Sequence, residues 1–330
     1  MQSKILKFDG ATIVSSASVV GKNEHDGPLG EYFDIFDPSD KFGMNTWEQA
    51  ESEMQRLAFN TALSKLSLTE RSIDAIFAGD LLNQCVGSSY GLLDFDIPYF
   101  GLYGACSTAA EGIMLASACV SAGYFSRAAA VTSSHYCSAE RQYRSPIEYG
   151  AQRSPTAQWT VTGAGAFIIS DNGKVKVSEG LPGIVIEKGI TDASNMGAAM
   201  APAAADTILR YFSSSGYSPR DFDMIVTGDL GLEGGSILCE LLHSENLDIK
   251  DRYFDCGTLI YDSPAQDKHA GGSGCGCSAT VLASYLIPML ESGEASDILL
   301  IGTGAMMSPS SIQQGFAIPA VAHLLRFSST

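Results

Sequence analysis

Cys106 is the side chain in this sequence best placed for nucleophilic chemistry. It follows Gly104 and Ala105 and opens a predicted helix that continues to about Ala122. At a helix N-terminus, unpaired backbone N–H groups and the helix macrodipole favour an anion, which lowers the pKa of a thiol. The pattern therefore predicts an activated thiol with room for a ligand among small neighbours. A buried, inert cysteine is the alternative.

A thiolate that transfers acyl groups also needs a base and hydrogen-bond donors for the developing oxyanion. Of the five histidines, His135 follows the strand after the Cys106 helix, and His269 precedes a second small-residue elbow at residues 274–277. Both could reach a cleft at the strand ends, or each could be structural. An acyltransferase that uses Cys106 with His135 or His269 is therefore one functional hypothesis.

Charge restricts the ligands that the chain can attract. The formal net charge of −17 opposes general affinity for nucleic acid or anionic lipid, because both carry phosphates. An anionic ligand needs a local exception, and residues 139–153 offer one, since three arginines there outnumber two glutamates: Arg141, Arg144 and Arg153. A solvated loop with ordinary ion pairs is the alternative for this segment.

The eight cysteines are scattered through apolar surroundings, which fits a reduced compartment better than a disulfide framework. Cys275 and Cys277 form a CxC, but no second pair with zinc-ligand spacing accompanies them, so no metal site is predicted. No stretch reaches the roughly 20 apolar residues of a membrane span. We expect a soluble protein made in the cytosol.

The elements that must position these side chains form an internal repeat. Residues 72–81 and 221–230 each give an apolar strand pattern that ends in Gly-Asp-Leu. Each copy follows a helical pattern and precedes a small-residue elbow, at residues 104–107 and 274–277. Strands alternating with long helices predict mostly parallel sheets joined by right-handed crossovers. We therefore predict an α/β fold of two duplicated halves, residues 1–178 and 179–330, with two sheets covered by helices.

Alternating and apolar runs predict the individual strands. These runs are residues 4–8, 12–16, 75–78, 128–132, 164–169, 184–187, 224–227, 298–301 and 317–318. Two long irregular segments lie between predicted elements, at residues 21–40 and 133–159. Loops of this length often carry function, so both are candidates for a functional role. The first is acidic and could bind a cation or a partner, or could be a solvated loop.

The duplicated unit with its Gly-Ala-Cys-Ser-Thr and Gly-Gly-Ser-Gly-Cys-Gly-Cys-Ser elbows resembles the thiolase superfamily. More narrowly, the chain resembles the stage V sporulation protein AD family of endospore-forming bacteria. Long strings carry this resemblance: KNEHDGPLG at 22–30, AGDLLNQ at 78–84, MAPAAADTI at 200–208 and GGSGCGCSA at 271–279. Matching segments extend almost from end to end of the chain.

This resemblance implies a five-layer αβαβα fold and binding of dipicolinic acid (pyridine-2,6-dicarboxylate), with calcium as its chelate partner. It implies a role in loading that compound into the developing spore and releasing it at germination. It also implies peripheral association with the spore inner membrane through other proteins of the stage V sporulation A operon. Pairing of sheet edges into a homodimer is a further expectation from the resemblance.

The chain departs from the condensing enzymes of the superfamily at two places. Gly228-Asp229 stands where an initiating ketoacyl synthase has its catalytic histidine, and residues 272–275 (GSGC) replace its Gly-Asn-Thr-Ser elbow. Condensation by the usual route is therefore not expected, and the pocket is interpreted as a retired active site. The predicted ligand-binding residues are Cys106, Ser107, His135, Arg141, Arg144, Asp229, His269 and Ser273. Either Arg141 or Arg144 is predicted to pair with one carboxylate of the ligand, and the N-terminus of the helix at Cys106 is predicted to bind the other.

A purely scaffolding role, in which the cleft is vestigial, is the third functional hypothesis.

Overall fold

The computed structural model describes residues 4–143 and 153–330. Its strands confirm the duplication, because two sets of five follow the same spatial order. The first half has the order β5-β4-β6-β8-β2, and the second has β11-β10-β13-β14-β9. The strands of the first half are β2 (Thr12–Gly21), β4 (Ala75–Gly79), β5 (Tyr99–Leu102), β6 (Ala128–Ser134) and β8 (Gly163–Ser170). Those of the second are β9 (Val175–Leu181), β10 (Met224–Thr227), β11 (Tyr253–Asp255), β13 (Asp297–Ala305) and β14 (Ala320–Ser329).

The two sets of strands meet along a very short seam. β2 and β9 pair at only two positions, Thr12 with Lys176 and Ile13 with Val175. This contact joins the expected two sheets into one 12-stranded sheet, with β1 (Leu6–Lys7) paired to β9 and β3 (Ile35–Asp37) paired to β2. The expected domain boundary at residue 178 falls inside β9.

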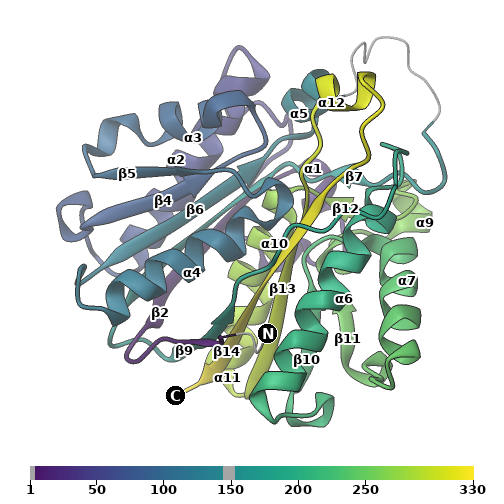
Figure 1. Ribbon diagram of the computed structural model, residues 1–330. Helices are drawn as coiled ribbons and strands as arrows, with labels where there is room; N and C mark the ends of the chain where they lie inside the picture. The colour runs from purple at the N-terminus through teal and green to yellow at the C-terminus, as the bar shows by residue number, and fades with distance from the viewer. Residues whose placement is uncertain (1–3, 144–152) are drawn as a thin grey trace.

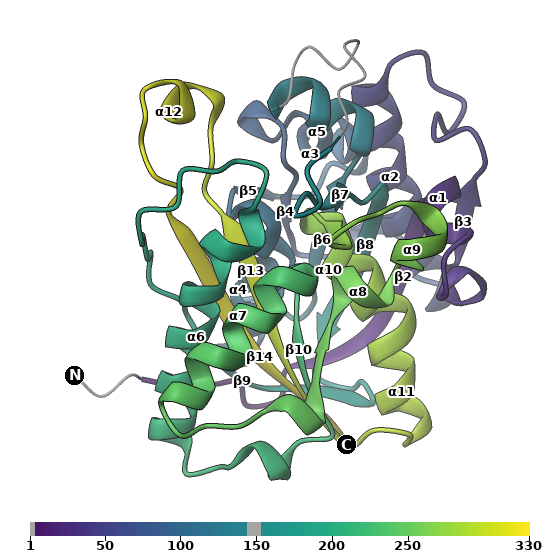
Figure 2. The same ribbon diagram turned by 90° about the vertical axis from the view of Figure 1, so that its right-hand side faces the viewer.

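Helices form three layers around these strands (Figures 1 and 2). The outer helices of the first half are α2 (Trp47–Lys65) and α3 (Val86–Gly91), and those of the second are α6 (Met196–Ser215) and α7 (Gly231–Ser244). Between the halves lie α4 (Thr108–Ser121), α10 (Cys275–Val281) and α11 (Ile287–Ser292). α4 packs on β4 and β6 of its own half and on β13 and β14 of the other. The result is the αβαβα layering that the resemblance to the thiolase superfamily implied.

Short elements complete the end of the molecule that carries the elbows. They are α1 (Lys22–His25), α5 (Tyr136–Tyr143), α8 (Cys256–Leu259), α9 (Ser263–Gln266), α12 (Pro309–Gln313), and the two-residue strands β7 (Trp159–Thr160) and β12 (Gly272–Ser273). β7 and β12 pair with each other in a separate small sheet. No helix in the two described ranges is long and apolar enough to cross a membrane.

Two predicted strands differ from the structure. Residues 184–187 make only one isolated bridge, between Ile186 and Ala320. Residues 317–318 precede β14, because Pro319 has no N–H to donate and the regular ladder begins at Ala320.

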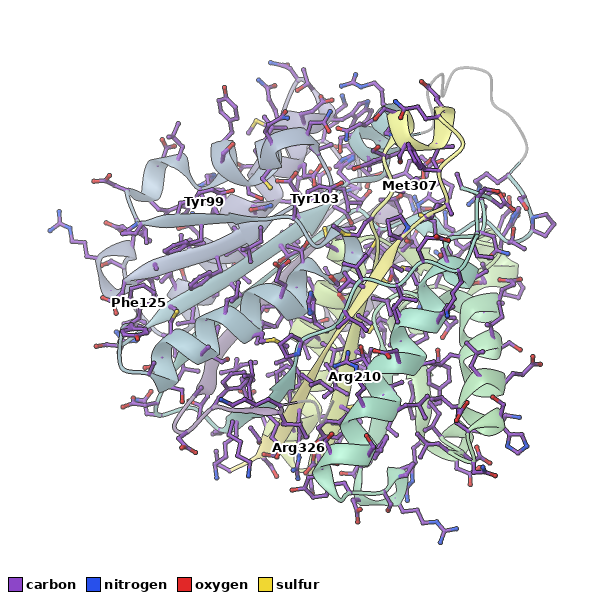
Figure 3. The ribbon with its side chains drawn as sticks, in the orientation of Figure 1. Tyr99, Tyr103, Phe125, Arg210, Met307 and Arg326 are labelled. Atoms are coloured by element: carbon purple, nitrogen blue, oxygen red, sulfur yellow. The ribbon has the colours of Figure 1, made fainter. Side chains whose placement is uncertain are left out.

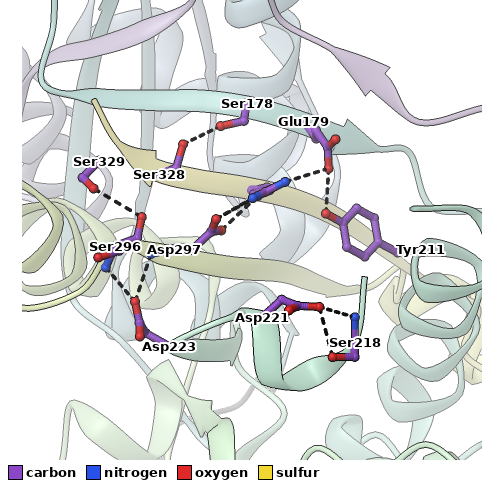
Figure 4. A network of polar contacts seen from close by, with 11 residues as sticks. Ser178, Glu179, Tyr211, Ser218, Asp221, Asp223, Ser296, Asp297, Ser328 and Ser329 are labelled. Atoms are coloured by element: carbon purple, nitrogen blue, oxygen red, sulfur yellow. Dashed lines mark hydrogen bonds and ion pairs between the residues drawn. The ribbon is translucent and has the colours of Figure 1, made fainter. Parts of the chain in front are cut away.

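The far end of the second half is held by a polar network (Figure 4). Arg326 on β14 donates from Nε and Nη2 to the carboxylate of Asp297 on β13. Tyr211 on α6 donates to Glu179 on β9 at 2.7 Å, and Asp223 accepts from the backbone N–H of Ser296 at 2.6 Å. This network joins β9, β13, β14 and α6 at the end opposite the elbows, so its role is structural.

Candidate functional site

Each elbow contains a residue with positive φ, a backbone conformation that residues other than glycine rarely adopt. Ala105 has φ 50° immediately before Cys106, and Gly274 has φ 100° at the start of α10. A Cβ on Gly274 would lie 2.6 Å from Ser134 Oγ on β6, so only glycine fits there. These sharp turns bring the two helix starts, from opposite halves of the chain, against each other.

The thiol of Cys106 shares a buried hydrogen-bond network with Asp229. Cys106 is 6% exposed and Asp229, in the turn after β10, is 1% exposed. Asp229 accepts from Thr303 Oγ1 at 2.7 Å, from Ser273 Oγ at 2.9 Å and from the Gly274 N–H at 3.0 Å. Ser273 connects the thiol to this carboxylate, since Cys106 Sγ lies 3.9 Å from Ser273 Oγ.

This environment makes Cys106 a poor nucleophile. Burial raises the pKa of the Cys106 thiol well above its usual value, and the negative charge of Asp229 raises it further. The predicted lowering of this pKa at a helix N-terminus is therefore wrong. The physical reason is that the thiol is removed from solvent and faces a carboxylate, which outweighs the helix dipole. Burial also raises the pKa of Asp229 itself, to about 7.

A small cavity of about 40 Å³ adjoins Cys106. Its walls are mostly apolar. Figure 3 labels two of the lining residues, Tyr103 after β5 and Met307 after β13. The cavity is lined by Leu81, Tyr103, Ala105, Cys106, Ala139, Glu140, Tyr143, Thr160, Met196, Ser273, Ala305 and Met307.

Three of the predicted site residues come together here. Cys106 and Ser273 line the cavity, and Asp229 lies behind them, bonded to Ser273. Ser107 is buried next to Cys106, but its hydroxyl donates back to the Gly104 carbonyl at 2.7 Å and is absent from the lining.

The two histidines are bonded elsewhere. His135 is fully buried; its Nε2 contacts the Asp40 carbonyl at 2.8 Å and its Nδ1 accepts from the Cys137 N–H at 3.1 Å. Burial lowers the pKa of His135, which keeps the ring neutral. His269 bonds through Nδ1 to the Ser154 carbonyl and through Nε2 to Asp267. Neither ring lines the cavity.

Of the two arginines predicted to bind a carboxylate, Arg141 does not line the cavity. Arg141 is an exposed surface residue that forms an ion pair with Glu48. Arg144 lies outside the described residues. The only charged side chains at the described cavity are therefore acidic: Glu140, which accepts from Thr160 Oγ1 at 3.1 Å, and Asp229 behind Ser273.

Sequence reasoning missed most of the cavity walls. Tyr103 and Tyr143 are joined by a hydrogen bond between their hydroxyls, and Tyr143 donates to the Leu81 carbonyl at 2.6 Å. Met196 and Met307 come from the other half. Tyr103 was detectable in principle, because it stands three residues before Cys106, but the others carry no sequence signal.

Comparison with known proteins places these features in a family. A model of the protein family "Stage V sporulation protein AD (SpoVAD)" matches residues 2–328. The chain belongs to the stage V sporulation protein AD family. It is 43% identical over 318 residues to stage V sporulation protein AD of Bacillus subtilis (strain 168), covering 96% of this chain and 94% of that protein. This SpoVAD chain is therefore a sporulation protein.

Solved structures confirm the thiolase-like fold of this SpoVAD chain. The 3-oxoacyl-[acyl-carrier-protein] synthase III of Aquifex aeolicus VF5 superposes with a TM-score of 0.57 at 13% identity, covering 96% of this chain and 99% of the enzyme. An OleA variant from Xanthomonas campestris gives a TM-score of 0.62 at 14% identity, covering 98% and 99%. At these identities the likeness shows the fold alone.

Proposed function

We propose that this SpoVAD chain binds dipicolinic acid without forming a covalent bond, in the cavity beside Cys106, and acts in its uptake into the developing spore and its release at germination. The observation that carries this proposal is the burial of the Cys106 thiol near the buried carboxylate of Asp229. Asp229 accepts three hydrogen bonds, and burial together with its negative charge disfavours the thiolate of Cys106. A site arranged in this way favours binding over acyl transfer.

The charges of the cavity favour the calcium chelate of the ligand over the free dianion. When it is ionised, Asp229 would repel the two carboxylates of the free dianion in so poorly solvated a place. A one-to-one chelate of Ca²⁺ with the dianion is neutral and avoids this repulsion. The described residues contain no group of three or more His, Cys, Asp or Glu side chains that could hold a metal, so the ion would enter with the ligand.

Binding requires the cavity to widen. A volume of about 40 Å³ holds one or two water molecules, which is less than an aromatic dicarboxylate needs. Met196 and Met307 are suited to this change, because an unbranched thioether side chain can move between several rotamers at small cost. The ring of Tyr143 would then offer a flat face to the pyridine ring.

Calorimetry tests the proposal with dipicolinate alone and with an equimolar mixture of dipicolinate and Ca²⁺. Heat release and a raised melting temperature are expected, larger with the mixture. Ser273→Ala removes a hydroxyl that lines the cavity and should weaken binding, whereas Ser278→Ala, a buried serine of α10 outside the cavity lining, should not. Absence of heat and of any melting shift at millimolar ligand would exclude the proposal.

The acyltransferase alternative makes a different prediction. Incubation with acyl thioesters would leave a covalent adduct on Cys106, detectable by mass spectrometry of the intact chain. We expect an unmodified thiol, because the raised pKa of Cys106 leaves almost no thiolate at neutral pH.

A homodimer and a membrane partner belong to the same proposal. β5 pairs only with β4 in the described sheet, and it carries the exposed rings of Tyr99 (39%) and Phe100 (47%). An apolar edge strand without a neighbour is a favourable place for a second copy to pair. Association with other stage V sporulation A proteins would bring this chain to the spore inner membrane.

A further inference from the structure

Two cations share one aromatic ring on the side of β7 away from the cavity. Lys268 Nζ lies 3.4 Å from the centroid of the Trp159 ring, and Arg153 Cζ lies 4.5 Å from it. Tyr136 stacks on Trp159 at a centroid distance of 3.8 Å and an interplanar angle of 9°, so one face of the indole is already covered. Both cations therefore crowd the remaining face.

Neither cation has a carboxylate partner among the described residues. Lys268 is 3% exposed, and its ammonium donates to the neutral amide oxygen of Asn23 at 3.0 Å. Arg153 donates from Nη2 to the Asp267 carbonyl oxygen at 2.5 Å. This arrangement is unexpected in a chain with 37 acidic and 20 basic residues, because a buried cation is normally paired.

Buried donors at the same place are unused. Arg153 Nη1 and Trp159 Nε1 are both inaccessible to solvent and have no hydrogen-bond acceptor among the described residues. The net pKa of Lys268 is lowered to about 8: burial and the charge of Arg153 lower it, and the charges of Glu24, Asp267 and Asp40 partly offset them. These acids have other partners: Asp267 pairs with His269, Glu24 accepts from Tyr261, and Asp40 accepts from the Lys22 N–H.

We propose that Lys268, Arg153 and Trp159 form a binding site for an oxyanion, the carboxylate or phosphate group of a small molecule, separate from the cavity beside Cys106. An oxyanion between the two cations would relieve their mutual repulsion and accept from the unused N–H groups. The site lies on the opposite side of β7 from Thr160, which lines the cavity. The proposal does not depend on the binding of dipicolinic acid.

Trp159 provides its own reporter, because the chain has only two tryptophans. In a Trp47→Phe background, inorganic phosphate and acetate are titrated separately at constant ionic strength while Trp159 emission is recorded. We expect a saturable change with at least one of them. Lys268→Met or Arg153→Gln should weaken the apparent affinity by roughly tenfold or more, because each removes a charge-assisted hydrogen bond. A response to phosphate alone assigns a phosphate group, and a response to acetate assigns a carboxylate.

Melting of the chain with both tryptophans intact gives an independent readout. Phosphate or acetate should raise the melting temperature of the unsubstituted protein. Lys268→Met should lose this shift while melting at the same or a higher temperature without added anion, since an unpaired buried charge is removed. Lys41→Met is the matched control, because Lys41 lies 3.4 Å over the ring of the other tryptophan, Trp47. Emission that does not saturate, or anion responses that persist in both site variants, would overturn the proposal.

Discussion

Cys106 and Asp229, 123 positions apart in the sequence and contributed by opposite halves, share one buried hydrogen-bond network. Ser273 connects them, since its hydroxyl donates to Asp229 Oδ2 at 2.9 Å and lies 3.9 Å from Cys106 Sγ. The carboxylate stabilises the protonated thiol and disfavours the thiolate. A fold that is shared with condensing enzymes thus presents its cysteine in a form suited to non-covalent contact.

Asp229→Asn should make Cys106 more reactive. Loss of the negative charge removes one of the causes that raise the thiol pKa, so alkylation by iodoacetamide at pH 8 should accelerate by about tenfold, equivalent to one pKa unit. Mass spectrometry of the Cys106 peptide against time measures the rate. Asp80→Asn, the counterpart in the other Gly-Asp-Leu copy, should leave that rate nearly unchanged. Equal rates in the Asp229 variant and the unsubstituted protein would contradict the role given to Asp229.

Glu24→Gln should flatten the pH dependence of stability. Glu24 is 1% exposed, and burial raises its pKa from 4.5 to about 7. The folded state therefore binds this proton more tightly than the unfolded state, so Glu24 lowers the free energy of unfolding as pH rises from about 4.5 to above 7. The Gln variant lacks this contribution. On going from pH 5 to pH 8, its free energy of unfolding should therefore fall by about 1–3 kcal/mol less than that of the unsubstituted protein, or rise by that much more. Urea unfolding at both pH values measures it, and Glu31→Gln, at an exposed position of the same segment, should retain the original dependence.

Arg326→Lys should destabilise the second half. The guanidinium of Arg326 makes two parallel hydrogen bonds to Asp297 and lies 4.4 Å over the Tyr217 ring, which an ammonium cannot reproduce. We expect a loss of about 2–4 kcal/mol in the free energy of unfolding, since a half-buried carboxylate loses much of its pairing. Chemical denaturation checks this, with Arg220→Lys at an exposed position as the control. A loss below about 0.5 kcal/mol would place the pair with ordinary surface ion pairs.

Gly274→Ala should be far more damaging than Gly293→Ala. Both glycines have positive φ, 100° and 81°. Alanine at 293 meets no atom within 4 Å and should cost about 1–2 kcal/mol from the backbone alone. Alanine at 274 adds the clash with Ser134 Oγ at 2.6 Å and should cost about 3 kcal/mol or more. Thermal unfolding of the two variants compares them, and similar melting temperatures would mean that the elbow can move away from β6.

Tyr99→Asp should favour the monomer if β5 is the edge at which two copies pair. A carboxylate on this strand would have to be buried in the proposed dimer but stays solvated in the monomer. Sedimentation velocity at micromolar concentration measures the change. Tyr124→Asp, at a ring that is 78% exposed after α4, is the control and should sediment as the unsubstituted chain does. A dimer that persists in Tyr99→Asp would require another interface.

The duplication of the fold was readable in the sequence. Two Gly-Asp-Leu strand ends and two small-residue elbows recur in the same order, and periodic apolar patterns are local signals. The position of Cys106 at an elbow followed from the same pattern. What periodicity could not predict is the pairing of β2 with β9, because a two-residue contact leaves no pattern in either strand.

The chemistry of the site was decided by tertiary structure. The residue types at the Cys106 elbow predicted a lowered thiol pKa, since a sequence shows a helix start but not the burial of a side chain or the charge opposite it. Only tertiary folding placed Asp229 near Cys106, turned His135 and His269 to backbone carbonyls, and set Lys268 and Arg153 over Trp159. Local conformation follows from neighbouring residues, whereas desolvation and electrostatic pairing also depend on groups that are distant in the sequence.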